Sequence, residues 1–144
     1  MTTDTTQATK PVLTVDAARA SVDAALAKAA EMGIAVTVTT VDDGGTPKAL
    51  VRMDGAPLVS VETARLKAYS AAAIGVATDD FFSAIAGDPS AVASFGTRPG
   101  LALIAGGIPL TVDGVVIGGV GVAGAMTGAQ DRAIAEVAVA AATG

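Results

Sequence analysis

Apolar residues recur at helical spacing from Val15 to Met32 near the start of the chain. Thr14 precedes them and can cap a helix with its side chain. Asp16 falls in the first turn, where the helix dipole favours negative charge, and Gly33 is a typical stop signal. The pattern predicts a helix over residues 14–32.

Two stretches predict β-hairpins. Residues 34–41 are rich in Val, Ile and Thr, and residues 48–53 return after a turn of Asp and Gly. Residues 100–126 are almost uncharged and long enough to span a bilayer. Asp113-Gly114 lies in their middle, and this dipeptide between apolar runs is the strongest short hairpin signal. We therefore expect a second hairpin there and no membrane span.

Further helices are predicted over residues 60–75, 79–86 and 129–142, with Thr78 capping the short one. Residues 87–100 show no regular pattern. The order is helix, hairpin, helix, short helix, hairpin, helix. It favours an α/β (α+β) domain with a mainly antiparallel sheet and packed helices.

Composition adds an expectation about assembly and location. Apolar residues make up 51% of the chain, aromatic residues only 3%, and there are 17 glycines. Since large exposed apolar patches are rare on monomers, we expect a homo-oligomer. Residues 1–11 are predicted to be a disordered tail and residues 12–144 a single domain. The tail lacks the features of a signal peptide, so a cytoplasmic location is expected.

Charge and missing residue types exclude several functions. The net charge is −5, and nine Lys and Arg residues are scattered along the chain. We therefore expect no nucleic-acid partner and no membrane partner. The chain has no His and no Cys. Thiolate catalysis, a Ser-His-Asp triad and a classical zinc site are thereby excluded, and no metal site is predicted.

A glycine pattern raises the question of a nucleotide site. Gly119, Gly121 and Gly124 match G-x-G-x-x-G. The dinucleotide fingerprint also needs a following helix, a second parallel strand and a distant acidic residue, and too few residues remain for these. The pattern favours a Gly-rich strand that admits a close neighbour or a ligand.

Two cations are candidates for ligand recognition. Arg52 ends a predicted strand in the run Arg-Met-Asp-Gly, and Lys67 lies on the following helix. Arg52 either belongs to an exposed turn or serves as an anion clamp. If the helix folds back across the strand, both side chains reach one edge of the sheet.

Other candidates lie in the second hairpin. Gly106, Gly107 and Pro109 form either a bulge or a set of backbone amides around an acidic ligand. Met126 and Met53 are the available soft donors for a haem or cobalt centre, although methionine more often serves in packing.

These stretches together resemble the GlcG/HbpS-like family, which is haem-binding-domain-like and similar to the C-terminal domain of PduO-type cobalamin adenosyltransferases. The first matching block includes residues 41–45, 52–56 and 67–68. The second includes residues 106–110, 113–114 and 118–124 and continues to Asp131 and Ala135.

The resemblance implies a profilin-like fold with a five-stranded antiparallel sheet and assemblies from dimer to octamer. It also implies haem or corrinoid binding by some members. This chain departs from the family in its turn, Gly-Val-Ala-Gly-Ala at residues 121–125, and in having no His ligand. The absence of His weakens the case for haem, so the cofactor is left unknown.

Three hypotheses follow. The first is an oligomeric small-molecule-binding protein for a partly anionic ligand, with haem or a corrinoid among the candidates. Its predicted binding residues are Arg52, Met53, Lys67, Gly106, Gly107, Pro109, Gly121, Gly124 and Met126. The alternative is an enzyme for proton transfer, isomerisation or lyase chemistry on a small oxygenated metabolite. Its predicted acids and bases are Lys67, Asp54, Asp42 and Asp131. The third is a scaffold without a ligand.

Overall fold

The computed structural model describes residues 6–143. In chain order its helices and strands are α1 (Val15–Glu31), β1 (Thr37–Asp42), β2 (Pro47–Arg52), α2 (Val59–Ile74), α3 (Thr78–Ile85), α4 (Pro89–Gly96), β3 (Gly107–Val112), β4 (Val115–Ala123) and α5 (Gly128–Thr143). The predicted order is confirmed, with α4 as an addition.

The strands form one antiparallel sheet in the order β2-β1-β4-β3. This confirms the mixed α/β class, but the sheet has four strands in the described residues, not the five that the resemblance implied. The segment that the sequence left unassigned does not add a strand. The Asp88 side chain accepts hydrogen bonds from the Ser90 and Ala91 amides and so caps a helix, and Pro89 occupies its first turn. The segment therefore forms α4. The profilin-like topology stays a prediction.

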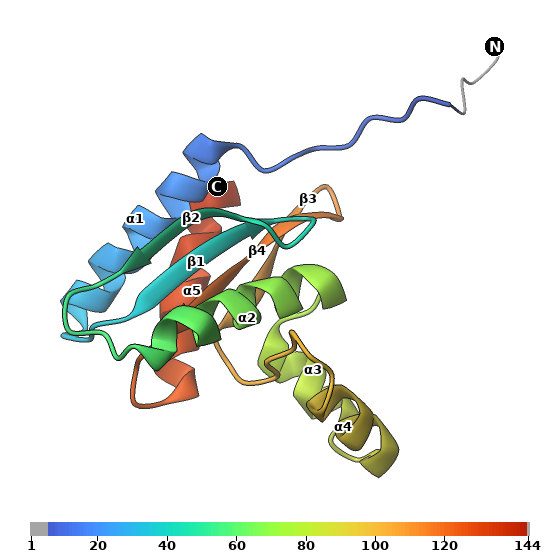
Figure 1. Ribbon diagram of the computed structural model, residues 1–144. Helices are drawn as coiled ribbons and strands as arrows, with labels where there is room; N and C mark the ends of the chain where they lie inside the picture. Colours follow the sequence, from blue (N-terminus) through green and yellow to red (C-terminus); the bar gives the residue numbers. More distant parts are fainter. Residues whose placement is uncertain (1–5, 144) are drawn as a thin grey trace.

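The helices cover both faces of the sheet. Helices α1 and α5 pack together on one face, and α2 crosses the other (Figure 1). The core under α1 and α5 is built mainly from Ala and Val, with Leu13, Leu110 and Ile134 as its larger members. Small side chains allow these layers to lie close together.

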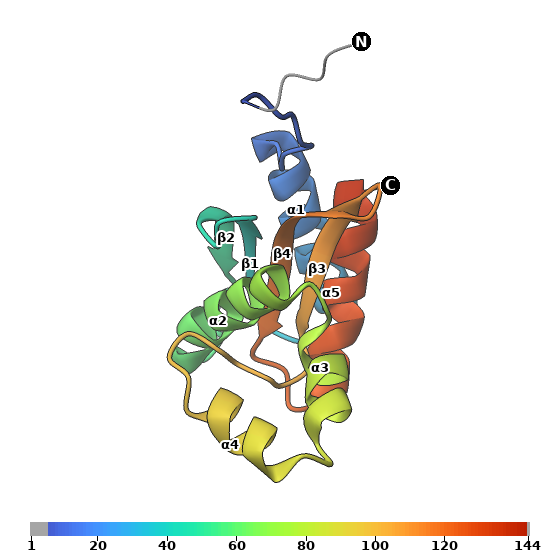
Figure 2. The ribbon, with the colours of Figure 1, turned by 90° about the vertical axis from the view of Figure 1, so that its right-hand side faces the viewer.

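Helices α3 and α4 project from this body as an arm (Figure 2). The rings of Phe81 and Phe95 meet edge to face with centroids 5.1 Å apart and join the two helices. The chain then returns past α2, where the Ser70 hydroxyl donates to the Leu66 carbonyl of its own helix and accepts from the Ala102 amide at 2.9 Å. The arm is thus tied back to α2 just before β3 begins.

Several local predictions are confirmed. Thr14 accepts a hydrogen bond from the Ala17 amide at the start of α1. Gly75 ends α2 with a φ of 81°. Asp113 and Gly114 both have positive φ, 50° and 78°, as a two-residue hairpin turn of this kind requires. No helix in residues 6–143 is long and apolar enough to cross a membrane.

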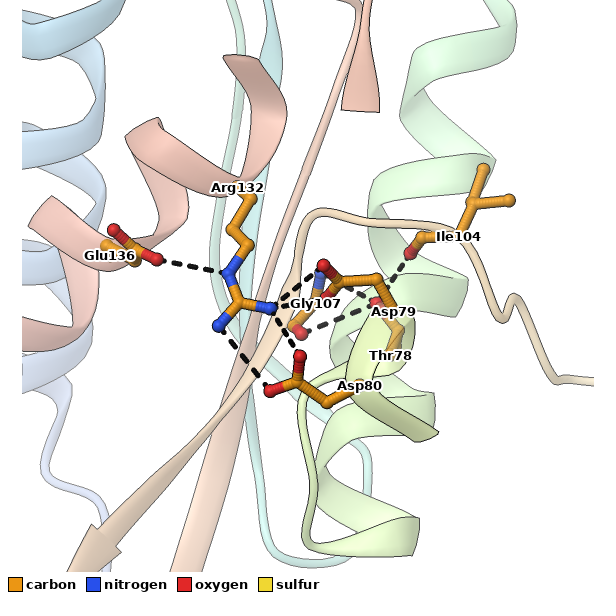
Figure 3. Close-up of polar contacts among 7 residues, drawn as sticks. All are labelled: Thr78, Asp79, Asp80, Ile104, Gly107, Arg132 and Glu136. Atoms are coloured by element: carbon orange, nitrogen blue, oxygen red, sulfur yellow. Dashed lines mark hydrogen bonds and ion pairs between the residues drawn. The ribbon is translucent and has the colours of Figure 1, made fainter. Parts of the chain in front are cut away.

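Thr78 does not cap α3 as predicted, since Ala77 occupies the cap position and the Thr78 side chain points elsewhere. Its hydroxyl donates to the Ile104 carbonyl and accepts from the Gly107 amide (Figure 3). Thr78 therefore fastens the arm to the start of β3.

Part of the predicted tail, residues 1–5, lies outside the described residues. Residues 7–11 are exposed and form neither helix nor strand. Lys10 forms an ion pair with Asp43 in the first hairpin turn.

Candidate functional site

A groove opens between α2, α3 and the start of α5. Its main part has a volume of about 570 Å³ and adjoins a second hollow of about 330 Å³ along the first turns of α2. The two hollows share Lys67, Ile104, Ala125, Met126 and Asp131. We call this combined space the α2–α5 groove.

Lys67 forms the floor of the groove. It extends from α2 towards β4 and is only 2% exposed. Its Nζ donates to the Val122 carbonyl at 2.9 Å and to Asp131 Oδ2 at 3.0 Å. A buried ammonium is strongly destabilising without such partners. Lys67 and Asp131 therefore form a coupled unit at the base of an open cavity.

Asp131 is held in place by the first turn of α5. Thr127 and Gln130 exchange hydrogen bonds between side chain and backbone, as in a capping box, and so fix where the helix begins. The Ala125 amide donates to Asp131 Oδ1 at 3.1 Å. Burial raises the pKa of Asp131 above its usual value, and the nearby Lys67 charge and its hydrogen bond oppose this effect.

Gly106 and Gly107 leave room for the ion pair. A Cβ on Gly106 would stand 2.9 Å from Lys67 Nζ and 2.5 Å from the Val122 carbonyl oxygen. A Cβ on Gly107 would stand 2.4 Å from the Lys67 carbonyl oxygen. The Gly107 amide is bonded to Thr78, so it does not face a ligand. These glycines support the floor through close packing.

The walls of the groove are apolar and come mostly from residues that sequence reasoning missed. Phe82 lies on α3, while Leu103 and Ile104 lie on the segment before β3. Phe82 and Ile104 are 43% and 57% exposed. Residues 100–106 were predicted to belong to the second hairpin, but β3 begins only at Gly107, so nothing in the sequence indicated that this segment lines a cavity.

An ion-pair cluster fastens the α3 wall to α5 (Figure 3). Arg132 Nη1 lies 2.8 Å from both Asp79 oxygens and 2.9 Å from Asp80 Oδ1, and its Nε donates to Glu136 at 3.0 Å. Hydrogen bonds that the guanidinium donates to these carboxylates raise the pKa of Arg132. Asp79 lines the groove, so its charge there is balanced by Arg132. Sequence reasoning missed this cluster, because Asp79 and Asp80 lie 53 and 52 residues before Arg132 in the chain.

The structure does not bring Arg52 and Lys67 together. Arg52 Nε and Nη2 both donate to the Ala56 carbonyl, at 3.1 and 2.8 Å, and so close the turn after β2. Arg52 lines a separate hollow against α1, together with Met53 and Asp54. The two cations therefore do not form one clamp, because the turn takes up the guanidinium.

Three other predicted residues have structural contacts away from the groove. Asp42 Oδ1 accepts from the Gly44 and Thr46 amides at 2.9 and 3.0 Å and shapes the first hairpin turn. The sulfur of Met53 accepts from the Val36 amide at 3.4 Å. Pro109 pairs with Gly119 between β3 and β4. Met126, by contrast, lines the groove and is 95% exposed.

The G-x-G-x-x-G glycines admit a close neighbour. A Cβ on Gly119 would stand 2.4 Å from the Ala68 carbonyl oxygen, and one on Gly121 would stand 1.9 Å from that of Ala64. Both neighbours belong to α2. Gly124 has a φ of +125° and approaches the Ala35 carbonyl oxygen. The glycines let α2 lie directly on β4, which in turn brings Lys67 to Val122.

The arrangement allows two kinds of chemistry. Apolar walls suit a flat apolar ligand, and the ion pair on the floor can bond a polar group or move a proton. No group of three or more Asp or Glu residues that could hold a metal ion occurs in residues 6–143. For the iron of a haem, the Met126 thioether is the soft donor at the groove.

Comparison with known families gives one matching model, described as haem degrading protein HbpS-like, over residues 13–140. An uncharacterized 15.0 kDa protein of Citrobacter freundii, from the dhaT-dhaS intergenic region, is 34% identical over 128 residues. That match covers 88% of this chain and 89% of the relative. The corrinoid adenosyltransferase PduO of the same organism is 37% identical over 122 residues, 82% of this chain but only 35% of PduO.

Two solved structures share the fold. A double mutant of Streptomyces reticuli HbpS superposes with a TM-score of 0.86 and 31% identity, covering 97% of this chain and 93% of HbpS. A crystal structure of a PduOC:Heme complex superposes with a TM-score of 0.83 and 32% identity, covering 91% of this chain and 95% of that one.

Proposed function

This chain belongs to the HbpS-like family, as its resemblance predicted, and from that premise we propose that it binds a tetrapyrrole in the α2–α5 groove. The observation that carries the proposal is the groove itself. Its walls are apolar side chains, among them Phe82 and Ile104, and its charged groups are paired. A tetrapyrrole ring needs a broad apolar slot of this kind.

The comparison with PduOC supports the proposal, since that protein has been solved as a haem complex. Met126 fits the role of a ligand to iron, because its thioether lies at the groove and is exposed. Met53 fits poorly, because its sulfur is engaged with the Val36 amide in another part of the fold.

Titration with haemin, followed by visible absorption, tests the proposal. We expect saturable binding with one haemin per chain. Ile104→Asp places a charge on the groove wall and should weaken binding strongly. Val12→Asp makes a matched change at another exposed position outside helices and strands, and it should bind like the parent. Met126→Ala should alter the spectrum of bound haemin, whereas Met53→Ala should not. Equal affinity of the parent and Ile104→Asp would place the ligand elsewhere.

A second candidate function is proton-transfer catalysis on a small oxygenated metabolite. The observation that favours it is the buried Lys67–Asp131 pair at the base of an open groove. Asp54 and Asp42, also predicted as acids or bases, lie outside the residues that line the groove. Incubation with 2-hydroxy and 2-oxo acids in D₂O, read by proton NMR, would reveal exchange at carbon. Activity that survives both Lys67→Met and Asp131→Asn would exclude the pair from such chemistry.

We also infer that the protein self-associates. Leu58, Val59 and Ile104 are large apolar residues with exposures of 74%, 70% and 57%, and they lie on or beside the residues that line the groove. Contact with a second copy would remove this surface from water. Light scattering should give at least twice the chain mass of 13.9 kDa. A single-chain mass at micromolar concentration would contradict the inference.

A further inference from the structure

We propose that the floor of the α2–α5 groove selects a ligand carrying a neutral primary amide over one carrying a carboxylate at the same place. This inference rests on the proposed tetrapyrrole function and concerns which rim groups the ring bears. Haem carries carboxylates on its rim, whereas corrin rings carry primary amides.

The charged residues of the groove are all paired. Among the described residues that line it, Lys67 is the cation, and its charge is balanced by Asp131 at 3.0 Å. Asp79, the other charged lining residue, is balanced by Arg132. Arg52, which a carboxylate would need as a second partner, lines a different hollow. A carboxylate entering the floor would therefore meet no uncompensated positive charge.

The Lys67–Asp131 pair has hydrogen-bonding capacity left over. An ammonium has three donors, and Lys67 uses two of them on Val122 and Asp131. Asp131 accepts one bond at each oxygen, from Lys67 and from the Ala125 amide, so each oxygen retains a lone pair. The floor thus offers one donor beside one acceptor.

A primary amide matches that combination. Its carbonyl oxygen can accept from Lys67 while its NH₂ group donates to Asp131. A carboxylate has only acceptors, so its second oxygen would face Asp131 without a proton between them, in a site where charges are poorly solvated.

The test compares metal-free protoporphyrin IX with its bis-amide, which has the same ring and differs only in the rim groups. Without iron, ligation by Met126 does not contribute. Fluorescence titration should show the bis-amide binding about tenfold more tightly, the equivalent of roughly one charged hydrogen bond. Equal affinity, or tighter binding of the dicarboxylate, would overturn the inference while leaving the tetrapyrrole proposal in place. If neither porphyrin binds while haemin does, the floor does not recognise the rim groups and the inference is wrong; if haemin does not bind either, the tetrapyrrole proposal fails as well.

Two variants locate the selectivity. Asp131→Asn removes the negative charge from the floor and should reverse the preference towards the dicarboxylate. Asp80→Asn changes the net charge by the same amount at a neighbouring α3 position that does not line the groove, and it should leave the preference unchanged. If Asp80→Asn reverses the preference as well, overall charge and not the floor pair selects the ligand, and the inference is wrong.

Discussion

The backbone of Gly121 on β4 lies directly against the carbonyl oxygen of Ala64 on α2, so that a Cβ at position 121 would stand 1.9 Å from that oxygen. A Cβ there would also stand 2.5 Å from the Ala68 amide nitrogen. Both neighbours are backbone atoms, which cannot rotate away as a side chain can. The spacing between α2 and β4 therefore depends on the absence of a side chain at position 121.

We expect Gly121→Ala to destabilise the fold by about 3 kcal/mol, the upper end of the range for overpacking a core. Because α2 would have to move off the sheet, binding in the groove should weaken as well. Gly87→Ala is the matched control, since a Cβ at position 87 meets no heavy atom within 4 Å. Urea unfolding measures both variants, and equal midpoints would contradict this account of the packing.

The sequence predicted the helices and hairpins whose signals are local. These signals act through neighbouring residues. The cap at Thr14 is confirmed by its hydrogen bond, and the helix end at Gly75 and the Asp113-Gly114 turn are confirmed by positive φ angles. Helix α4 was missed although Asp88-Pro89 is a strong start signal. The fifth strand came only from the family resemblance.

The site was predictable only in part, because its contacts join distant parts of the chain. Lys67 and Asp131 were both predicted as candidates, but their pairing across 64 residues left no periodic signal. From its residue type and its position in the sequence, Arg52 looked as suitable as Lys67 for binding an anionic ligand. Its guanidinium is instead taken up by the Ala56 carbonyl four residues later, a local contact that spacing alone did not indicate.

The buried hydroxyl of Thr39 leads to a second prediction. Its Oγ1 has no hydrogen-bond partner in the described residues, whereas Thr37 Oγ1, two residues earlier on the same strand, lies 2.8 Å from Ser60 Oγ. We expect Thr39→Val to raise stability by about 1 kcal/mol, because it removes an unsatisfied polar group without changing the shape of the side chain. Thr37→Val should lower stability by a similar amount. The unfolding temperatures of the two variants should shift in opposite directions. Shifts in the same direction would contradict the conclusion that the Thr39 hydroxyl is unsatisfied and the Thr37 hydroxyl is bonded.

A third prediction concerns the link between the arm and the sheet. Thr78→Val removes the acceptor of the buried Gly107 amide and the donor to the Ile104 carbonyl. The expected cost is about 1–3 kcal/mol, with faster hydrogen exchange at the Gly107 amide. Thr97→Val, which removes an exposed hydroxyl bond to the Ala93 carbonyl, serves as the control and should have little effect. Unchanged exchange at Gly107 would show that the Thr78 hydroxyl does not hold the arm.

Burial and the Lys67 charge act in opposite directions on the pKa of Asp131, and we expect burial to dominate. Burial raises the pKa of Asp131 above its ordinary value of 3.8, with Lys67 opposing it. The folded protein then keeps a proton on Asp131 at a pH where the unfolded chain has released it. The contribution of this group to stability is therefore fully present below 3.8 and declines as the pH rises through the folded pKa.

The direction in which the stability contribution of Asp131 changes with pH can be measured by comparing the parent with Asp131→Asn. The Asn side chain does not titrate. The unfolding free energy of the parent minus that of the variant should fall as the pH is raised from 3 to 7, since the other carboxylates are common to both proteins. Lys67→Met removes the opposing charge, so it should raise the pKa of Asp131 further, which carbon-13 NMR of the labelled carboxyl group reports directly. If the free-energy difference rises with pH instead, the Lys67 charge outweighs burial and the pair is a net stabilising salt bridge at neutral pH.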